Sequence, residues 1–145
     1  MTNEENFSEK LEHFIELFGR RAIGDFVAFA KVSGLSMPQI NVLMHLYYLK
    51  SCEIANIKKF ISGDFVAATQ IVDRLAQRGL VERTLLPEDH RVRIVGLTEQ
   101  GKELVQASIN ARRQWIRELS GQFSVEDQAA LDRSISLLIS KMESG

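Results

Sequence analysis

This sequence of 145 residues contains only one cysteine, Cys52. One thiol cannot form a disulfide within the chain or supply the several thiolates of a cysteine-rich zinc site. No apolar run reaches the roughly 18 residues that a membrane-spanning helix needs. The first ten residues, MTNEENFSEK, do not resemble a signal peptide. We therefore expect a cytoplasmic protein with no membrane partner.

The sequence also lacks a strong excess of charge of either sign. The formal net charge is −1 at pH 7, which does not indicate a nucleic-acid binder with a broadly basic surface. Negative charge gathers near the start of the chain, where residues 1–18 hold one lysine, Lys10, and the glutamates Glu4, Glu5, Glu9, Glu12 and Glu16. Any surface that binds DNA is therefore expected to be a local patch.

Patterns typical of catalysis and of metal binding are missing as well. The three histidines, His13, His45 and His90, fall on separate predicted elements. The sequence shows no pairing of a nucleophile with a base and no metal-ligand spacing. We predict that the protein is not an enzyme and has no catalytic residue, no metal site and no cofactor.

What the sequence does contain is helical periodicity. Its length is typical of one domain with its own core, residues 1–145. Large apolar side chains recur every three or four positions across residues 7–30, which predicts a first helix that ends at Gly34. That helix carries more aromatic surface than one face of a monomeric helix usually needs: Phe7, Phe14, Phe18, Phe26 and Phe29.

A second helix, QINVLMHLYYL, is predicted to start at Ser36 and Pro38. It is apolar nearly all round, so we expect it to be central and buried. His45 is the exception within it. We favour a core histidine that is hydrogen-bonded to a neighbour over a histidine that contacts a ligand.

A helix–turn–helix is predicted next. A short helix spans about Glu53 to Ile61, and Asp64 is a suitable N-cap for another helix, DFVAATQIVDRLAQR. Gly79 is expected to cap its C-terminus. Ala68, Ile71, Val72 and Leu75 share the inner face of this helix. The other face carries Phe65, Val66, Thr69, Gln70, Asp73 and Arg74.

Two short extended runs, LVERTLL and VRIVGLT, follow with PEDHR between them. Tight two-residue hairpins favour glycine because they need positive φ. No glycine is present, so we expect a longer and more open connection. A helix–turn–helix followed by a two-stranded hairpin is a winged helix. Its second helix fits the major groove of DNA, while the hairpin tip reaches a phosphate strand or the minor groove.

Two further helices complete the predicted fold. One spans residues 99–120, and the other follows a capping pair, Ser124 and Asp127. Apolar residues of the last helix recur at helical spacing: Leu131, Ile135, Leu138 and Met142. The fold class is therefore mainly α with a small β-hairpin (α+β).

The stretch IVDRLAQRGLVERTLLPEDHRVRIVGLTEQGKEL resembles the signature of the multiple-antibiotic-resistance regulator (MarR) family. In that family a recognition helix ends in V-D-x-L-x-x-x-G-L-V-x-R, a wing carries D-x-R, and the wing closes at L-T-x-x-G. The matching residues in this sequence are Val72, Asp73, Leu75, Gly79, Leu80, Val81, Arg83, Asp89, Arg91, Leu97, Thr98 and Gly101.

The resemblance implies a winged helix–turn–helix core over residues 36–101, with dimerisation helices over residues 5–33 and 99–143. It implies a homodimeric transcriptional repressor that binds a pseudo-palindromic operator in double-stranded DNA. It also implies release from DNA by a small aromatic or apolar ligand. Near an aromatic surface, the residues expected to meet such a ligand and its carboxylate are Phe18, Arg21, His45 and Tyr48.

The predicted recognition face departs from the family pattern. Family members often carry Ser, Thr and Arg at the positions of Phe65, Val66, Ala67 and Gln70. Base reading would then depend on Thr69 and Gln70, with methyl contacts from Phe65 or Val66 to thymine. Thr69 and Gln70 could equally be ordinary exposed polar residues. Residues 53–93 contain seven Lys or Arg and six Asp or Glu, a net charge of +1, so DNA affinity is expected to be moderate and salt-sensitive.

The DNA-binding residues expected on the recognition helix and the wing are Phe65, Val66, Thr69, Gln70, Arg74, Asp89, Arg91 and Arg93. An arginine at a turn is often only solvated, but the D-x-R match favours a DNA contact by Arg91. Asp89 either orients Arg91 through a salt bridge or only starts the turn. Arg93 either contacts DNA or pairs with Glu82 or Glu88 across the hairpin.

Two alternatives remain at this point. The apolar pair Phe65 and Val66 would also suit a winged helix that binds another protein and no DNA. Cys52 would suit a redox-responsive regulator, because the start of the third helix and nearby Lys50 could lower its pKa.

Overall fold

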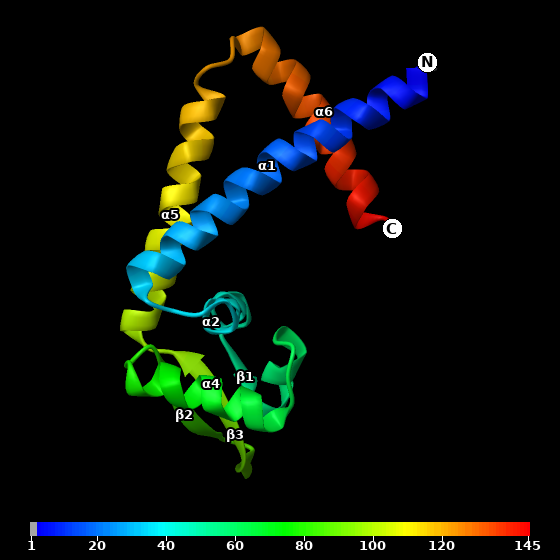
Figure 1. Ribbon diagram of the computed structural model, residues 1–145. Coiled ribbons are helices and arrows are strands. Elements are labelled where there is room, and N and C mark those ends of the chain that lie inside the picture. Colours follow the sequence, from blue (N-terminus) through cyan, green and yellow to red (C-terminus); the bar gives the residue numbers. More distant parts are fainter. Residues whose placement is uncertain (1–2) are drawn as a thin grey trace. The chain divides into compact units, whose positions relative to one another are not determined.

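The computed structural model describes residues 3–145, which divide into two compact units, residues 3–108 and 109–145 (Figure 1). The first unit begins with helix α1 (Asn3–Ser33). As predicted, α1 ends at Gly34, which adopts φ +67°, a left-handed conformation that glycine tolerates. None of the helices in residues 3–145 is long and apolar enough to cross a membrane.

Helix α2 (Met37–Leu49) starts at the capping box formed by Ser36 and Gln39, with Pro38 in its first turn. It is the buried centre of the first unit, as its composition predicted, and its most buried apolar side chains are Ile40, Val42, Leu43 and Leu46. His45 donates a hydrogen bond of 2.9 Å from its Nδ1 to the carbonyl of Asn41 and stacks on Phe60 with ring centroids 4.2 Å apart. His45 is half-buried, and the predicted hydrogen bond to a neighbouring residue is present.

The predicted helix from Glu53 to Ile61 is wrong at its start. Residues Ser51–Glu53 form strand β1, and only Ile54–Ile57 form helix α3, which a 3₁₀ helix, η1 (Lys58–Phe60), follows. Lys50 takes φ 72° between α2 and β1, and the backbone then turns directly into the strand. Strand β1 pairs with β3, so a long-range contact overrides the local helical tendency.

Strand β2 (Val81–Leu86) and strand β3 (Asp89–Leu97) form the wing, and the antiparallel sheet has the order β1-β3-β2. The expected hairpin therefore has a third strand. Only Pro87 and Glu88 separate β2 from β3, so the prediction of a longer open loop is wrong. Leu85 pairs with Arg93 while Leu86 pairs with Asp89, which leaves residues 90–92 as a bulge in β3. The bulge adds unpaired residues to β3 beside the turn, and tight hairpins with a glycine turn do not need this extra length.

Helix α4 (Phe65–Gln77) packs beside β2 and carries the recognition face (Figure 1). Asp64 caps it by accepting a hydrogen bond of 2.9 Å from the amide of Ala67. Ala68, Val72 and Leu75 are fully buried on its inner face, as predicted. Gly79, with φ +71°, terminates the helix, and the amide of Leu80 donates to the carbonyl of Leu75.

Helix α5 (Glu99–Ser120) begins against the end of α4. The Thr98 hydroxyl donates to the carbonyl of Gly79 at 2.6 Å, and the Thr98 amide donates to the carbonyl of Leu80 at 3.2 Å. A Cβ atom at Gly101 would lie 2.0 Å from the Leu80 oxygen, so only glycine fits there. The L-T-x-x-G motif is therefore the docking point of α5 on the winged helix.

The second unit consists of the end of α5 and helix α6 (Val125–Glu143). Ser124 caps α6 as predicted, because its hydroxyl accepts from the Asp127 amide at 3.1 Å and donates to the Asp127 carboxylate at 2.8 Å. No residue of α6 is buried within one chain. Most of its apolar stripe is exposed, including Leu131, Ile135 and Met142.

Gly101→Ala should destabilise the protein, because the new methyl group meets a backbone carbonyl that cannot move away by a rotamer change. A loss of about 1–3 kcal/mol is typical for overpacking of this kind. Thermal melting measures it. Gly24→Ala is the matched control, since no atom lies within 4 Å of a Cβ built there. Equal melting temperatures for wild type and Gly101→Ala would contradict the close approach.

Candidate nucleic-acid interface

The outer face of α4 is open to solvent over its first turns. Phe65 is 54% exposed and Val66 is 61% exposed, although both are large apolar side chains. Gln70 and Arg74 are exposed one and two turns further on. Thr69 is half-buried and its hydroxyl donates to the carbonyl of Phe65 at 2.9 Å. Its donor is therefore engaged, and Gln70 is the better placed of the two polar residues for a base edge.

Asp73, on the same helix, has a partner in the wing. Its carboxylate forms an ion pair with the guanidinium of Arg83 on β2. Sequence reasoning placed Asp73 on the exposed face and matched Arg83 only as part of a motif. The pair joins the recognition helix to the first strand of the wing. The ten-residue spacing was visible in the sequence, but the contact depends on how β2 packs beside α4.

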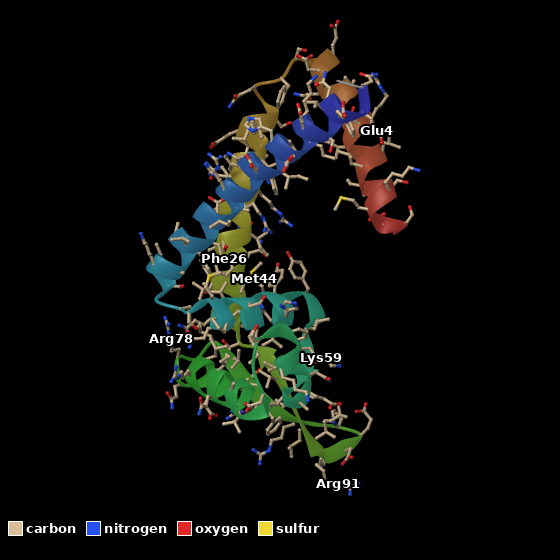
Figure 2. The ribbon with its side chains drawn as sticks, turned by 45° about the vertical axis from the view of Figure 1, so that its right-hand side comes forward. Glu4, Phe26, Met44, Lys59, Arg78 and Arg91 are labelled. Atoms are coloured by element: carbon tan, nitrogen blue, oxygen red, sulfur yellow. The ribbon has the colours of Figure 1, made fainter. Side chains whose placement is uncertain are left out.

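Arg91 lies in the bulge of β3, and Figure 2 shows it at the extremity of the wing. Its side chain is 92% exposed. The Asp89 carboxylate accepts from the Arg91 amide at 3.1 Å and from its Nε at 3.2 Å. Asp89 therefore orients Arg91; it is the first residue of β3, after the turn residues Pro87 and Glu88, and does not start the turn.

Three of the predicted DNA-binding residues come together in one shallow hollow of about 310 Å³, lined by Phe65 of α4 and by Arg91 and Arg93 of β3. Glu53 and Ile54 form its other side. Within residues 3–145, Arg93 makes no ion pair with Glu82 or Glu88. The start of the recognition helix and strand β3 of the wing thus meet at this hollow, which Phe65, Arg91 and Arg93 line together.

The four predicted ligand-binding residues make separate local contacts or are exposed. Phe18 stacks on Phe14, Arg21 pairs with Asp25, and Tyr48 is 63% exposed. A hollow of about 700 Å³ in the first unit is lined by none of the four. Its lining comes from α1, α2, η1, α4 and the residues between them: Phe26, Met37, Pro38, Asn41, Lys59, Phe60, Ile61, Ser62, Ala67 and Ile71. His45 does not line this hollow, but it stacks on Phe60, which does.

Cys52 does not have the environment of a reactive thiol. It lies on β1 and is half-buried, not at the start of a helix. Burial raises the pKa of the Cys52 thiol above its usual value, and the negative charge of Glu53 raises this pKa further. The expectation that a helix terminus and Lys50 lower this pKa is wrong. Because a lowered pKa was the physical reason for a redox role, that reason no longer applies.

Comparison with known proteins agrees with this geometry. Residues 35–92, from the start of α2 to the bulge of β3, match the MarR family. The HTH-type transcriptional regulator YdgJ of Bacillus subtilis is 30% identical over 125 residues, which cover 86% of this chain and 75% of YdgJ. The chain belongs to the MarR family. A second relative, the HTH-type transcriptional regulator YsmB of Bacillus subtilis, is 26% identical over 94% of this chain and 97% of its own length.

Solved MarR structures confirm the expected winged-helix fold. The multiple antibiotic-resistance repressor of Listeria monocytogenes superimposes with a TM-score of 0.79 over 100% of both chains, at 20% identity. A mutant MarR of E. coli, solved in complex with operator DNA, has a TM-score of 0.56, with 94% of this chain and 99% of that chain covered at 22% identity. The MarR family consists of transcriptional regulators, so regulation of transcription is the function class of this chain.

Proposed function

We propose that the protein is a homodimeric repressor that binds a pseudo-palindromic operator in double-stranded DNA. One observation carries the proposal: the exposed outer face of α4 and the exposed Arg91 of the wing belong to one unit, and they meet at the hollow beside Phe65. A helix of 13 residues with a free face fits the major groove. An arginine at the wing tip fits a narrow minor groove.

Each recognition element has a defined part in this proposal. Gln70 offers a donor and an acceptor to adenine, and Arg74 contacts phosphate or a guanine edge. Arg91 enters the minor groove, held by Asp89, and Arg93 approaches a phosphate from the base of the wing. A MarR protein from E. coli has been solved on operator DNA, and this chain shares its fold.

The homodimer is proposed from apolar surface that one chain leaves uncovered. Helix α1 exposes Phe7, Phe14, Ile15, Leu17, Phe18 and Ile23. In the second unit, the end of α5 and the start of α6 form a groove of about 620 Å³ lined by apolar residues that include Ile116, Leu119, Phe123, Leu131 and Ile135. Large exposed apolar surfaces such as each of these mark interaction sites. We assign residues 5–33 and 99–143 to the subunit interface and residues 36–101 to the DNA-binding core.

Sedimentation at low micromolar concentration should give about twice the 16.4 kDa mass of the chain. Ile135→Glu should shift the protein toward monomer, because it places a charge in the apolar groove. Leu85→Glu is the control, since Leu85 is an exposed leucine of the wing. A wild-type monomer would contradict the dimer. The two recognition helices of a dimer should read half-sites roughly 10 bp apart, about one helical turn.

Arg91→Ala should weaken operator binding by about 1–3 kcal/mol if the guanidinium contacts bases or the groove edge. Arg91→Lys should recover part of the loss, since lysine lacks the planar fork. Asp89→Ala should also weaken operator binding, but by less than Arg91→Ala does. Fluorescence anisotropy at fixed salt, on an operator selected from genomic fragments, measures each affinity. Arg133→Ala removes the same charge from α6 and serves as the control, with sedimentation to verify that this variant stays dimeric. Wild-type affinity in a folded Arg91→Ala protein would show that the wing does not bind DNA.

Phe65 and Val66 give a chemical test of base reading. Replacing thymine by uracil in the operator removes only the 5-methyl group. Loss of one buried methyl contact is worth about 0.8 kcal/mol, or about fourfold in affinity. We expect wild type to lose affinity at one or more thymines, and Phe65→Ala or Val66→Ala to become insensitive at the same position. Equal effects of uracil on wild type and both variants would show that these side chains do not touch thymine.

The same apolar pair supports the second candidate, a winged helix that binds a protein partner. A gel-shift titration with genomic fragments separates the two functions. Saturable retardation that weakens with salt supports the regulator, because phosphate contacts release counterions. Complete absence of retardation at low salt favours the protein-binding module.

We further propose that a small aromatic acid occupies the hollow between α1, α2, η1 and α4. Phe26 and Phe60 offer apolar walls and Lys59 offers a partner for a carboxylate. Phe26 and Lys59 are labelled in Figure 2. Ala67 and Ile71 of the recognition helix line the same hollow, so a ligand there can bind two orientations of α4 with different affinity. Aromatic acids should raise the melting temperature of wild type more than that of Lys59→Met. For wild type, this increase should be smaller when operator is bound. Stabilisation that operator does not change would mean binding without regulation.

A further inference from the structure

The C-terminal end of the recognition helix is attached to α1 by one side chain, Arg78. Its Nη1 donates to the carbonyl of Gly34 at 3.2 Å, and its Nη2 donates to the carbonyl of Ser33. The last carbonyls of a helix have no partner within the helix. A cation at this end also complements the helix dipole. Arg78, which is labelled in Figure 2, therefore closes the C-terminus of α1 from 44 and 45 residues away.

The local backbone of α1 is shaped for this contact. Gly34 has φ +67°, which turns the chain out of the helix and leaves two successive carbonyls for one guanidinium. The Ser33 hydroxyl donates to the carbonyl of Phe29 at 2.7 Å and accepts from the Leu35 amide at 3.3 Å, so the turn is fixed by its own hydrogen bonds. Two parallel donors on a rigid plane match two fixed acceptors, a geometry that arginine provides and lysine does not.

The residues that follow Arg78 fasten α5 in the same way. The carbonyls of Gly79 and Leu80 accept hydrogen bonds from Thr98, and Gly101 lies against Leu80. Both α1 and α5 therefore meet α4 at Arg78–Leu80. The opposite end of α4 carries the exposed Phe65 and Val66. The helix is about 20 Å long at 1.5 Å per residue, so a rotation of about 6° at its fastened end moves the reading end by about 2 Å.

We propose that Arg78 is a positioning residue: it sets the orientation of the recognition helix relative to α1, and so the separation of the two recognition helices in the dimer. This inference depends on the proposed function, because it assumes a dimer that reads two half-sites. Arg78 does not have to touch DNA for this role. Loss of the Arg78 side chain should leave base recognition by each α4 unchanged. It should make the distance between the N-terminal ends of the two α4 helices more variable.

The test is selection of bound sequences from random DNA with the full-length chain. Wild type, Arg78→Met and Arg78→Lys are compared, with Gln77→Met as a neighbouring control on the same helix end. Two features of the enriched DNA are measured for each variant: the bases of the half-site and the distribution of spacings between half-sites. Anisotropy then compares affinity for the wild-type operator with affinity for a single half-site, and a melting curve is recorded for each variant.

We expect wild type and Gln77→Met to enrich one spacing. Arg78→Met should enrich the same half-site bases at several spacings, and should lose about tenfold in affinity for the wild-type operator with little change for the single half-site. Arg78→Lys should fall between them, because it can satisfy one carbonyl at a time. A purely structural role would instead lower both affinities together and leave the spacing sharp.

A single sharp spacing and wild-type affinity in Arg78→Met would overturn the inference and leave the regulator intact. If Arg78→Met melts before the assay temperature, Arg78→Lys decides: a broadened spacing supports the role, and a sharp one overturns it. If wild type enriches no paired half-sites, the proposed function fails and this inference fails with it.

Discussion

The contact between the backbone of α5 at Gly101 and the carbonyl of Leu80 is the constraint on which the placement of the recognition helix depends. The space there admits no side chain, so α5 begins directly on the residue that follows the turn out of α4. Thr98 fixes the same junction through both its amide and its hydroxyl. Because α4 is held at its C-terminal end, its N-terminal turns stay free to present Phe65, Val66 and Gln70.

Two ion pairs shape the candidate DNA-binding surface, and neither is buried. Asp73 holds Arg83 between α4 and β2, and Asp89 holds Arg91 in the bulge. Exposed ion pairs contribute little net stability. Arg91 can therefore exchange its carboxylate partner for a DNA acceptor at small cost, while Asp89 keeps the bulge ordered through the backbone amide. The two acids also lower the local positive charge, which supports the expectation of a moderate DNA affinity.

Helical periodicity predicted the long helices well, because their apolar spacing and caps are local features. The ends at Gly34 and Gly79 and the caps at Ser36, Asp64 and Ser124 all lie where the residue types indicated. Strand β1 could not be predicted in this way, since three residues carry no periodic signal and form a strand only because β3 lies beside them. The same limit explains why Cys52 was assigned to a helix start.

Side-chain contacts between residues far apart in the sequence could not be predicted either. Asp89 and Arg91 are two residues apart, and their pairing was considered from the sequence. Arg78 caps α1 from across the fold, and the exposed arginine gave no sign of it. The hollow beside Lys59 likewise depends on how η1 packs against α2 and α4. Residues whose partners are local were found, and residues whose partners come from distant elements were missed.

The most direct test of DNA reading by α4 and the wing is hydrogen–deuterium exchange of the full chain with and without a selected operator. Binding through this surface should slow exchange most strongly at the amides of residues 65–74 and 89–93, and more than at those of α6. An operator that is bound with unchanged exchange in both segments, or with protection confined to other residues, would contradict the proposed interface.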